Sequence, residues 1–230
     1  MNPELYNFIA LDLPPLLALL FGGVTCAVLG NFLILRKSAL LGDTISHAVL
    51  PGLVLGFLIS HSRDSFVMFI GAAISGIIAS VLSEFLRKYA KIESGASMGV
   101  VFSVMFALGV LLIEQASASG VDIDADCVLN GIIESLIWNP PSSFSEIFTL
   151  EALSNFPKEV SYSFLSMAFV SLAIWVFWKE LIVSSFDPEY SSSIGFSSNL
   201  INLGFVCLVA LAVVASFTAV GSILVIGMLV

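Results

Sequence analysis

Residues 36–52 read RKSALLGDTISHAVLPG, and the interpretation of the whole chain starts from this stretch. It places two basic residues, and then Asp43 and His47 four positions apart, between two long apolar runs. A spacing of i, i+4 puts both side chains on one face of a helix, and we expect Ser46 on that face too. A charged carboxylate at the centre of a membrane helix costs about 2.5–3.5 kcal/mol on insertion scales, so such residues usually face a protein interior or a wet cavity. We therefore interpret the stretch as one wall of a path for a divalent cation.

Apolar residues dominate the rest of the chain. They make up 58% of it, and charged residues only 11%, against about 25% in a typical soluble domain. Several windows of about 20 residues are nearly free of charge, which is the length needed to cross a bilayer. These features predict an all-α membrane protein, a polytopic helical bundle with a single transmembrane domain over residues 1–230. The formal charge of −9 and the lack of a basic patch argue against a nucleic-acid partner.

The apolar runs predict six full transmembrane helices followed by a truncated seventh segment at 221–230. The expected spans are approximately 13–35, 42–60, 66–86, 96–113, 162–178 and 200–219. The acidic segment between the fourth and fifth spans contains one apolar piece, 127–138, that is too short to cross a bilayer. We expect this piece to form a re-entrant or surface helix.

Basic residues set the expected orientation. If the spans alternate, Arg63 and Lys158 fall on one side of the membrane, and six basic residues fall on the other: Arg36, Lys37, Arg87, Lys88, Lys91 and Lys179. Loops rich in lysine and arginine stay in the cytoplasm. We therefore expect the N-terminus and the acidic loop to lie outside the cell.

Asp43 and His47 have the chemistry of metal ligands. A neutral imidazole with a carboxylate suits Mn²⁺, Fe²⁺ or Zn²⁺, although zinc takes about four donors and the pair supplies two. Pro51 has no N–H, so it cannot bond the carbonyl of His47, which is left to kink the helix, bind water or face the path. The spacing leaves a plainer interpretation equally open, in which Asp43 caps a helix and His47 is an ordinary interior histidine.

A second stretch, FDPEYSSSIGF at 186–196, predicts a short cytoplasmic helix between the fifth and sixth spans. Asp187 is an N-cap candidate, Pro188 fits the first helical position, and Glu189 suits the positive end of the helix. Gly195 is a plausible stop. Both a plain connector and a docking helix for a cytoplasmic partner remain open.

These stretches resemble the membrane permeases of ATP-binding-cassette importers that carry manganese, zinc or chelated iron. Residues 36–52 are similar to the second-span motif of that family, GDxxxHxVLPG. GASMGVVFSVMFALGVLLI (95–113) resembles its fourth span, and DADCVLNGII (124–133) its short loop helix. KELIVSSFDPEYSSSIGF (179–196) is similar to the approach to its coupling helix, and VGSILVIGMLV (220–230) to the start of its next helix.

The resemblance implies a permease subunit of an ATP-driven metal importer in the plasma membrane, which itself hydrolyses nothing. It implies that Asp43 and His47 coordinate the transported divalent metal, and we assign Ser46 and Pro51 to the path and its kink. It implies no permanently bound cofactor. A cytoplasmic coupling helix would press on the ATPase through Asp187, Pro188, Glu189, Tyr190 and Gly195. The implied partners are ATP-binding-cassette ATPase subunits, an extracytoplasmic metal-binding lipoprotein, and a second permease copy or a sister permease.

Family members continue for several tens of residues past the point matching Val230, so the resemblance implies a C-terminally incomplete permease, either a fragment or a shortened variant. The VLPG form of the motif favours manganese, with iron or zinc as alternatives. Two other classes remain open. An intramembrane metalloenzyme would need a third ligand and a base beside Asp43 and His47, and an ion-coupled secondary transporter would need no ATPase.

Overall fold

The structure is a computed structural model, and it describes residues 3–60, 65–118, 133, 136–138 and 156–229. Most of the predicted loop helix at 127–138 falls outside these residues. The described part is built from helices, whose bounds are α1 Pro3–Asn7, η1 Phe8–Asp12, α2 Leu13–Leu35, α3 Leu41–Ser60, α4 Ser65–Ala90, α5 Ser94–Ala118, α8 Lys158–Val176, α9 Trp178–Phe186, α10 Pro188–Ser193, α11 Ser198–Val220 and α12 Ser222–Leu229. The all-α prediction is confirmed.

Six of the described helical segments are long and apolar enough to cross a membrane, as the sequence predicts. They are Phe8–Leu35, Leu41–Ser60, Val67–Ala90, Ser94–Ser117, Lys158–Val176 and Ser198–Phe217. The predicted seventh segment forms α12. The boundaries differ at α5, which runs to Ala118 rather than to about 113, because helical hydrogen bonding continues past the apolar run.

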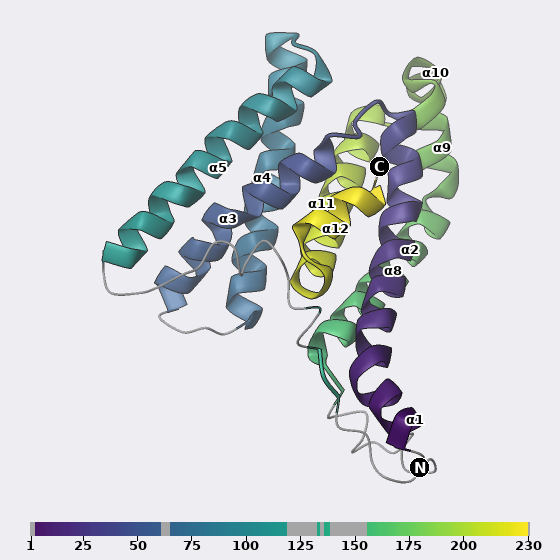
Figure 1. Cartoon of the computed structure of the whole chain (residues 1–230). Coiled ribbons are helices and arrows are strands. Elements are labelled where there is room, and N and C mark those ends of the chain that lie inside the picture. The colour runs from purple at the N-terminus through teal and green to yellow at the C-terminus, as the bar shows by residue number, and fades with distance from the viewer. Residues whose placement is uncertain (1–2, 61–64, 119–132, 134–135, 139–155, 230) are drawn as a thin grey trace.

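The helices form two groups, which Figure 1 shows side by side. One group contains α3, α4 and α5, and the other contains α2, α8, α9, α11 and α12. Helix α11 joins them, because it packs against α3 and α4 as well as α2 and α8. The main hydrophobic core accordingly draws Leu29 and Leu33 from α2, Ile45 and Val49 from α3, and Val209 and Val213 from α11.

Helices α3 and α4 cross at two facing glycines. A Cβ on Gly52 would collide with the backbone carbonyl of Gly71, and a Cβ on Gly71 would collide with the carbonyl of Gly52. Just beside this crossing, the hydroxyl of Ser75 on α4 donates a 2.6 Å hydrogen bond to the carbonyl of Ala48 on α3. Small residues let membrane helices approach closely. The crossing therefore fixes the position of α3, the helix that carries Asp43.

A tight turn joins α2 to α3. Lys37 has a positive φ of 55°, the N–H of Ser38 donates to the carbonyl of Leu33 at 2.9 Å, and the N–H of Leu41 donates to the carbonyl of Ser38 at 3.0 Å. The first two features define a Schellman-type helix end, in which a left-handed residue closes the last turn. Lys91, directly after α4, has a similar φ of 52°. Both lysines thus adopt the left-handed backbone conformation that is usually found at glycine.

The fifth span differs most from its prediction. Helix α8 starts at Lys158, earlier than expected, and ends at Val176, and Phe177 then breaks the helical geometry with φ −97° and ψ 22°. A new helix, α9, continues to Phe186, which the sequence analysis did not predict. Leu181 and Ser184 of α9 are buried. This buried stripe explains why a segment that is much less apolar than a membrane span is helical.

Candidate metal site on α3

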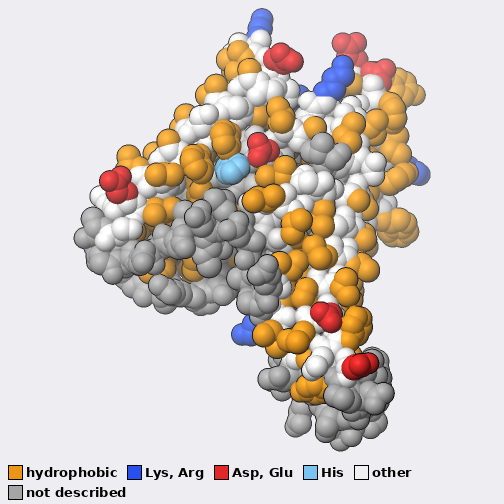
Figure 2. Space-filling view, in the orientation of Figure 1, with side chains coloured by type: hydrophobic (Ala, Val, Ile, Leu, Met, Phe, Trp, Pro, Cys, Tyr) orange, Lys and Arg blue, Asp and Glu red, His pale blue; other side chains and the backbone are white. Residues whose placement is uncertain are grey.

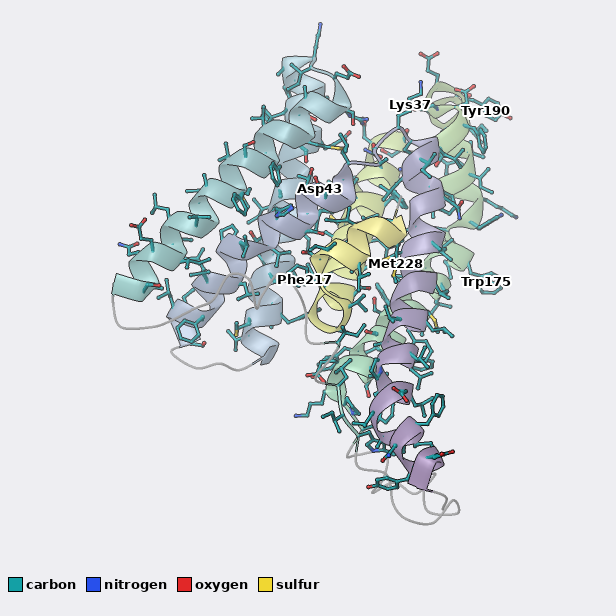
Figure 3. All side chains as sticks on the ribbon, in the orientation of Figure 1. Lys37, Asp43, Trp175, Tyr190, Phe217 and Met228 are labelled. Carbon is teal, nitrogen blue, oxygen red and sulfur yellow. The ribbon has the colours of Figure 1, made fainter. Side chains whose placement is uncertain are left out.

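Asp43 and His47 lie one turn apart on α3, as predicted. The distance between Asp43 Oδ1 and His47 Nε2 is 3.5 Å, and the two side chains are 44% and 25% exposed. Figure 3 places Asp43 on α3 between the level of Lys37 and that of Phe217. In Figure 2 an imidazole lies beside an acidic side chain on a largely hydrophobic face. The pair therefore faces a surface of this chain instead of being sealed in its core.

The separation of the two atoms suits joint coordination of one cation. A metal bonded to a carboxylate oxygen and an imidazole nitrogen at about 2.0–2.2 Å, with a tetrahedral angle between them, holds these atoms about 3.4 Å apart. The observed 3.5 Å is close to that value and longer than a normal N–H···O hydrogen bond. Among the described residues no group of three or more His, Cys, Asp or Glu side chains lies close enough to hold a metal. The described part of the chain thus contributes two donors.

Aromatic rings from α5 fix the orientation of the imidazole. The ring of His47 meets Phe102 edge-on with centroids 4.9 Å apart, and Phe106 with centroids 5.7 Å apart. Its Nδ1 atom is buried and has no hydrogen-bond partner among the described residues, so Nε2 is the nitrogen that remains for Asp43 or a cation. The sequence analysis did not single out these phenylalanines. Their i, i+4 spacing on the fourth span is the signal that would have identified them as one packing face.

The positions of Ser46 and Pro51 agree only in part with the sequence analysis. Ser46 is fully buried, and its hydroxyl donates to the carbonyl of Gly42 at 2.9 Å, so it does not share the exposed side of Asp43 and His47. Pro51 lies inside α3, which continues through it to Ser60. A Cβ on Gly109 would come within 3.2 Å of the Pro51 ring, so α5 approaches α3 closely at this point. A role for Ser46 or Pro51 in the path stays a prediction.

The predicted helix after the fifth span is present as α10. Asp187 is its N-cap, and one carboxylate oxygen accepts hydrogen bonds from the N–H of Glu189 at 3.1 Å and of Tyr190 at 2.9 Å. Pro188 occupies the first turn, and Gly195 has a positive φ of 96° just past the end. Glu189 and Tyr190 are exposed, and α10 projects at the end of the bundle in Figure 1. The helix is confirmed, and its docking role stays a prediction.

A groove elsewhere on the chain does not compete as a cation site. It lies between α4, α8 and α11, has a volume of about 430 Å³, and is lined by apolar side chains such as Phe69, Phe169 and Leu211, with Tyr162 and Ser166 as the polar exceptions. Divalent cations need several oxygen, nitrogen or sulfur donors. The groove is suited to hydrocarbon contact.

Comparison with known proteins shows that the chain matches the ABC 3 transport family over residues 10–135 and 146–230. It is 38% identical over 211 residues to the zinc transport system membrane protein TroD of Treponema pallidum, covering 90% of this chain and 54% of TroD. It is 37% identical to the manganese transport system membrane protein MntD of Bacillus subtilis, covering 90% of this chain and 68% of MntD.

Among solved structures, the chain resembles one in the PsaBC complex of Streptococcus pneumoniae with a Fab. The TM-score is 0.68 at 29% sequence identity, and the alignment covers 94% of this chain and 68% of that one. The chain therefore spans between about half and two thirds of the length of these relatives.

Proposed function

Because this chain belongs to the ABC 3 transport family, we propose that it acts as the permease subunit of an ATP-driven metal importer. In this role the six candidate spans form one half of a membrane path, and the cation passes the exposed face of α3. ATP-driven movement of the docked ATPase would then switch the path between outward and inward access. The transported metal is the substrate of the protein, and none of these steps requires a resident cofactor.

The observation that carries this proposal is the Asp43–His47 pair. A carboxylate and an imidazole are placed 3.5 Å apart on a membrane helix, partly exposed, with the second imidazole nitrogen buried against aromatic rings. Ionisable residues within membrane spans are rare, and they mark functional sites such as substrate and ion pathways and proton relays. The names of the relatives, which include zinc and manganese transport system membrane proteins, support the same assignment.

The test is metal uptake by cells that carry the permease with its ATPase. We expect Asp43→Ala and His47→Ala each to abolish ATP-dependent accumulation of Mn²⁺ while the amount of permease in the membrane stays normal. Thr44→Ala is a matched control on the same turn, because its hydroxyl donates to the carbonyl of Leu40 at 3.0 Å, within one helical turn of its own position. Unimpaired uptake in both variants would reject the pathway role, and uptake that needs no ATPase would favour a secondary transporter.

We assign manganese as the first choice of metal, with iron and zinc as alternatives. The comparisons name both zinc and manganese systems at nearly equal identity, so they do not choose between them. The donor pair contains no thiolate, and carboxylate oxygen suits Mn²⁺ well. Elemental analysis of cells grown with equal concentrations of the three metals tests the order.

We assign each proposed partner to one end of the helical bundle, using the positions of the basic residues. Lys37 and Tyr190 lie at the same end in Figure 3, and the α4–α5 turn with Lys91 is at that end in Figure 1. This clustering of basic residues supports a cytoplasmic assignment for the end that carries α10, with the N-terminus outside. An ATPase would dock on α10, and changing Glu189 or Tyr190 should weaken its recovery. An extracytoplasmic metal-binding lipoprotein would dock at the opposite end, and a second or sister permease would complete the path.

A further inference from the structure

One half-buried arginine at the end of α2 contacts two other helices. The Nε of Arg36 donates to Ser185 Oγ at 2.9 Å, and its Nη2 donates to Ser184 Oγ at 2.8 Å. Its Nη1 donates to Asn202 Oδ1 at 2.9 Å, and its guanidinium carbon lies 4.5 Å from the centre of the Phe205 ring. A guanidinium presents its donors in a rigid planar fork, so three bonds fix its orientation closely. Arg36 therefore ties α2 to both α9 and α11.

The partners of Arg36 lie on both sides of the helix α10. Ser184 and Ser185 are in the last turn of α9, directly before the N-cap Asp187. Asn202 is in the beginning of α11, which follows α10 after a short link. The same guanidinium thus holds the segment that enters α10 and the segment that leaves it. A push on α10 that moves either flank has to move Arg36 or break its hydrogen bonds.

Arg36 is also connected to the metal pair through the turn between α2 and α3. The backbone bonds of Ser38 and Leu41 close this turn, and the Ser38 hydroxyl donates to the carbonyl of Arg36 at 3.2 Å. Asp43 follows in the first turn of α3. A short, hydrogen-bonded turn has little conformational freedom. A displacement of Arg36 would therefore also move the backbone of Asp43.

The charge of Arg36 is retained in this environment. Burial lowers the pKa of Arg36 to about 10, Arg87 contributes to the decrease, and the nearby carboxylate of Glu84 opposes it. The guanidinium is therefore protonated at neutral pH. Its hydrogen-bond acceptors are neutral hydroxyl and amide oxygens, which bind a cation less strongly than a carboxylate does. Such contacts hold a resting geometry and can be exchanged during a conformational change.

We propose that Arg36 is a positioning residue that couples the docking helix α10 to the Asp43–His47 pair. The inference rests on the proposed function, because it describes how ATPase movement would reach the cation. When the ATPase shifts α10, α9 and α11 shift with it, and the fork of Arg36 carries the movement into the end of α2. The loop between α2 and α3 then reorients the start of α3. This movement changes the side of the membrane from which the two metal ligands can be reached.

The test measures coupling rather than activity alone. The permease and its ATPase are reconstituted in liposomes, and Mn²⁺ uptake and ATP hydrolysis are measured in parallel. We expect Arg36→Gln to lower the Mn²⁺ transported per ATP hydrolysed by at least about fivefold, the lower end of typical coupling between two sites. ATPase recovery with the permease should stay unchanged, because α10 is intact. Lys37→Asn is the matched control, since it removes the neighbouring exposed charge at a left-handed position that asparagine tolerates.

The outcomes separate this inference from the proposed function. If the unaltered complex shows no ATP-dependent Mn²⁺, Fe²⁺ or Zn²⁺ uptake, the proposed function fails and the coupling role fails with it. If the unaltered complex transports and Arg36→Gln keeps the same ratio of metal to ATP, only the coupling role is overturned. Should Arg36→Gln fail to reach the membrane, Asn202→Ala removes a single hydrogen bond, and an unchanged ratio in that variant also overturns the role.

Discussion

The cap of α10 offers a quantitative test of the docking helix. α10 has six residues and is largely exposed, so little tertiary packing supports it. The carboxylate of Asp187 bonds two of its free N–H groups, at 3.1 Å and 2.9 Å. Replacing such a cap by alanine costs about 1 kcal/mol, which lowers the ratio of formed to unformed helix roughly fivefold. We expect Asp187→Ala to lower recovery of the ATPase with the permease by up to that factor when the ATPase is below saturation.

The assay is co-purification of the ATPase with affinity-tagged permease at several ATPase concentrations. Asp187→Asn is the matched variant, because asparagine caps helices about as well as aspartate and removes only the charge. We expect it to retain most of the ATPase. The amount of permease in the membrane should be the same for both variants, since Asp187 lies outside the candidate spans. Full recovery with Asp187→Ala, or equal losses in both variants, would refute the argument from capping.

Two further predictions concern packing around α3. Gly52→Ala should lower the melting temperature of the purified permease in detergent, because the new Cβ meets backbone atoms of α4 and overpacking costs about 1–3 kcal/mol. Gly99→Ala is the control, because no described residue outside its own helical turn comes within 4 Å of a Cβ at that site. Equal melting temperatures in the two variants would contradict the close crossing. Phe102→Ala should raise the Mn²⁺ concentration for half-maximal uptake by about twofold to tenfold, since an aromatic pair contributes about 0.5–1.5 kcal/mol to holding the ring of His47. Leu111→Ala, at a 59% exposed position of the same helix, should leave that concentration unchanged, and an unchanged value in Phe102→Ala would show that the ring does not depend on this contact.

Much of the fold is predictable because the membrane restricts the choices. A run of about 20 apolar residues must be helical in a bilayer, where every backbone polar group needs an internal partner. Local chemistry also predicted α10, since Asp187, Pro188 and Gly195 each suit their positions at the ends of a helix. The i, i+4 spacing was sufficient to bring Asp43 and His47 together, because both lie on a single helix.

The features that the sequence did not reveal depend on contacts between helices. Arg36 was counted as a basic residue at a membrane boundary, yet its partners in α9 and α11 lie more than 140 positions further along the chain. Ser46 is on the same helix as the pair, but the packing of α3 against its neighbours buries it. Helix α9 has too little apolar content to predict a membrane helix, and its buried residues depend on packing against neighbouring helices that include α2 and α11.

The two left-handed lysines show a conflict between local backbone preference and membrane topology. Lys37 and Lys91 each follow the end of a candidate span with φ values of 55° and 52°, a conformation that costs a non-glycine residue about 1–2 kcal/mol. Glycine would remove this cost at either position, but it would also remove a positive charge from a boundary that the proposed orientation places in the cytoplasm. A glycine at either position should therefore lower the conformational cost of the turn and weaken the charge bias that sets the orientation of the chain in the membrane.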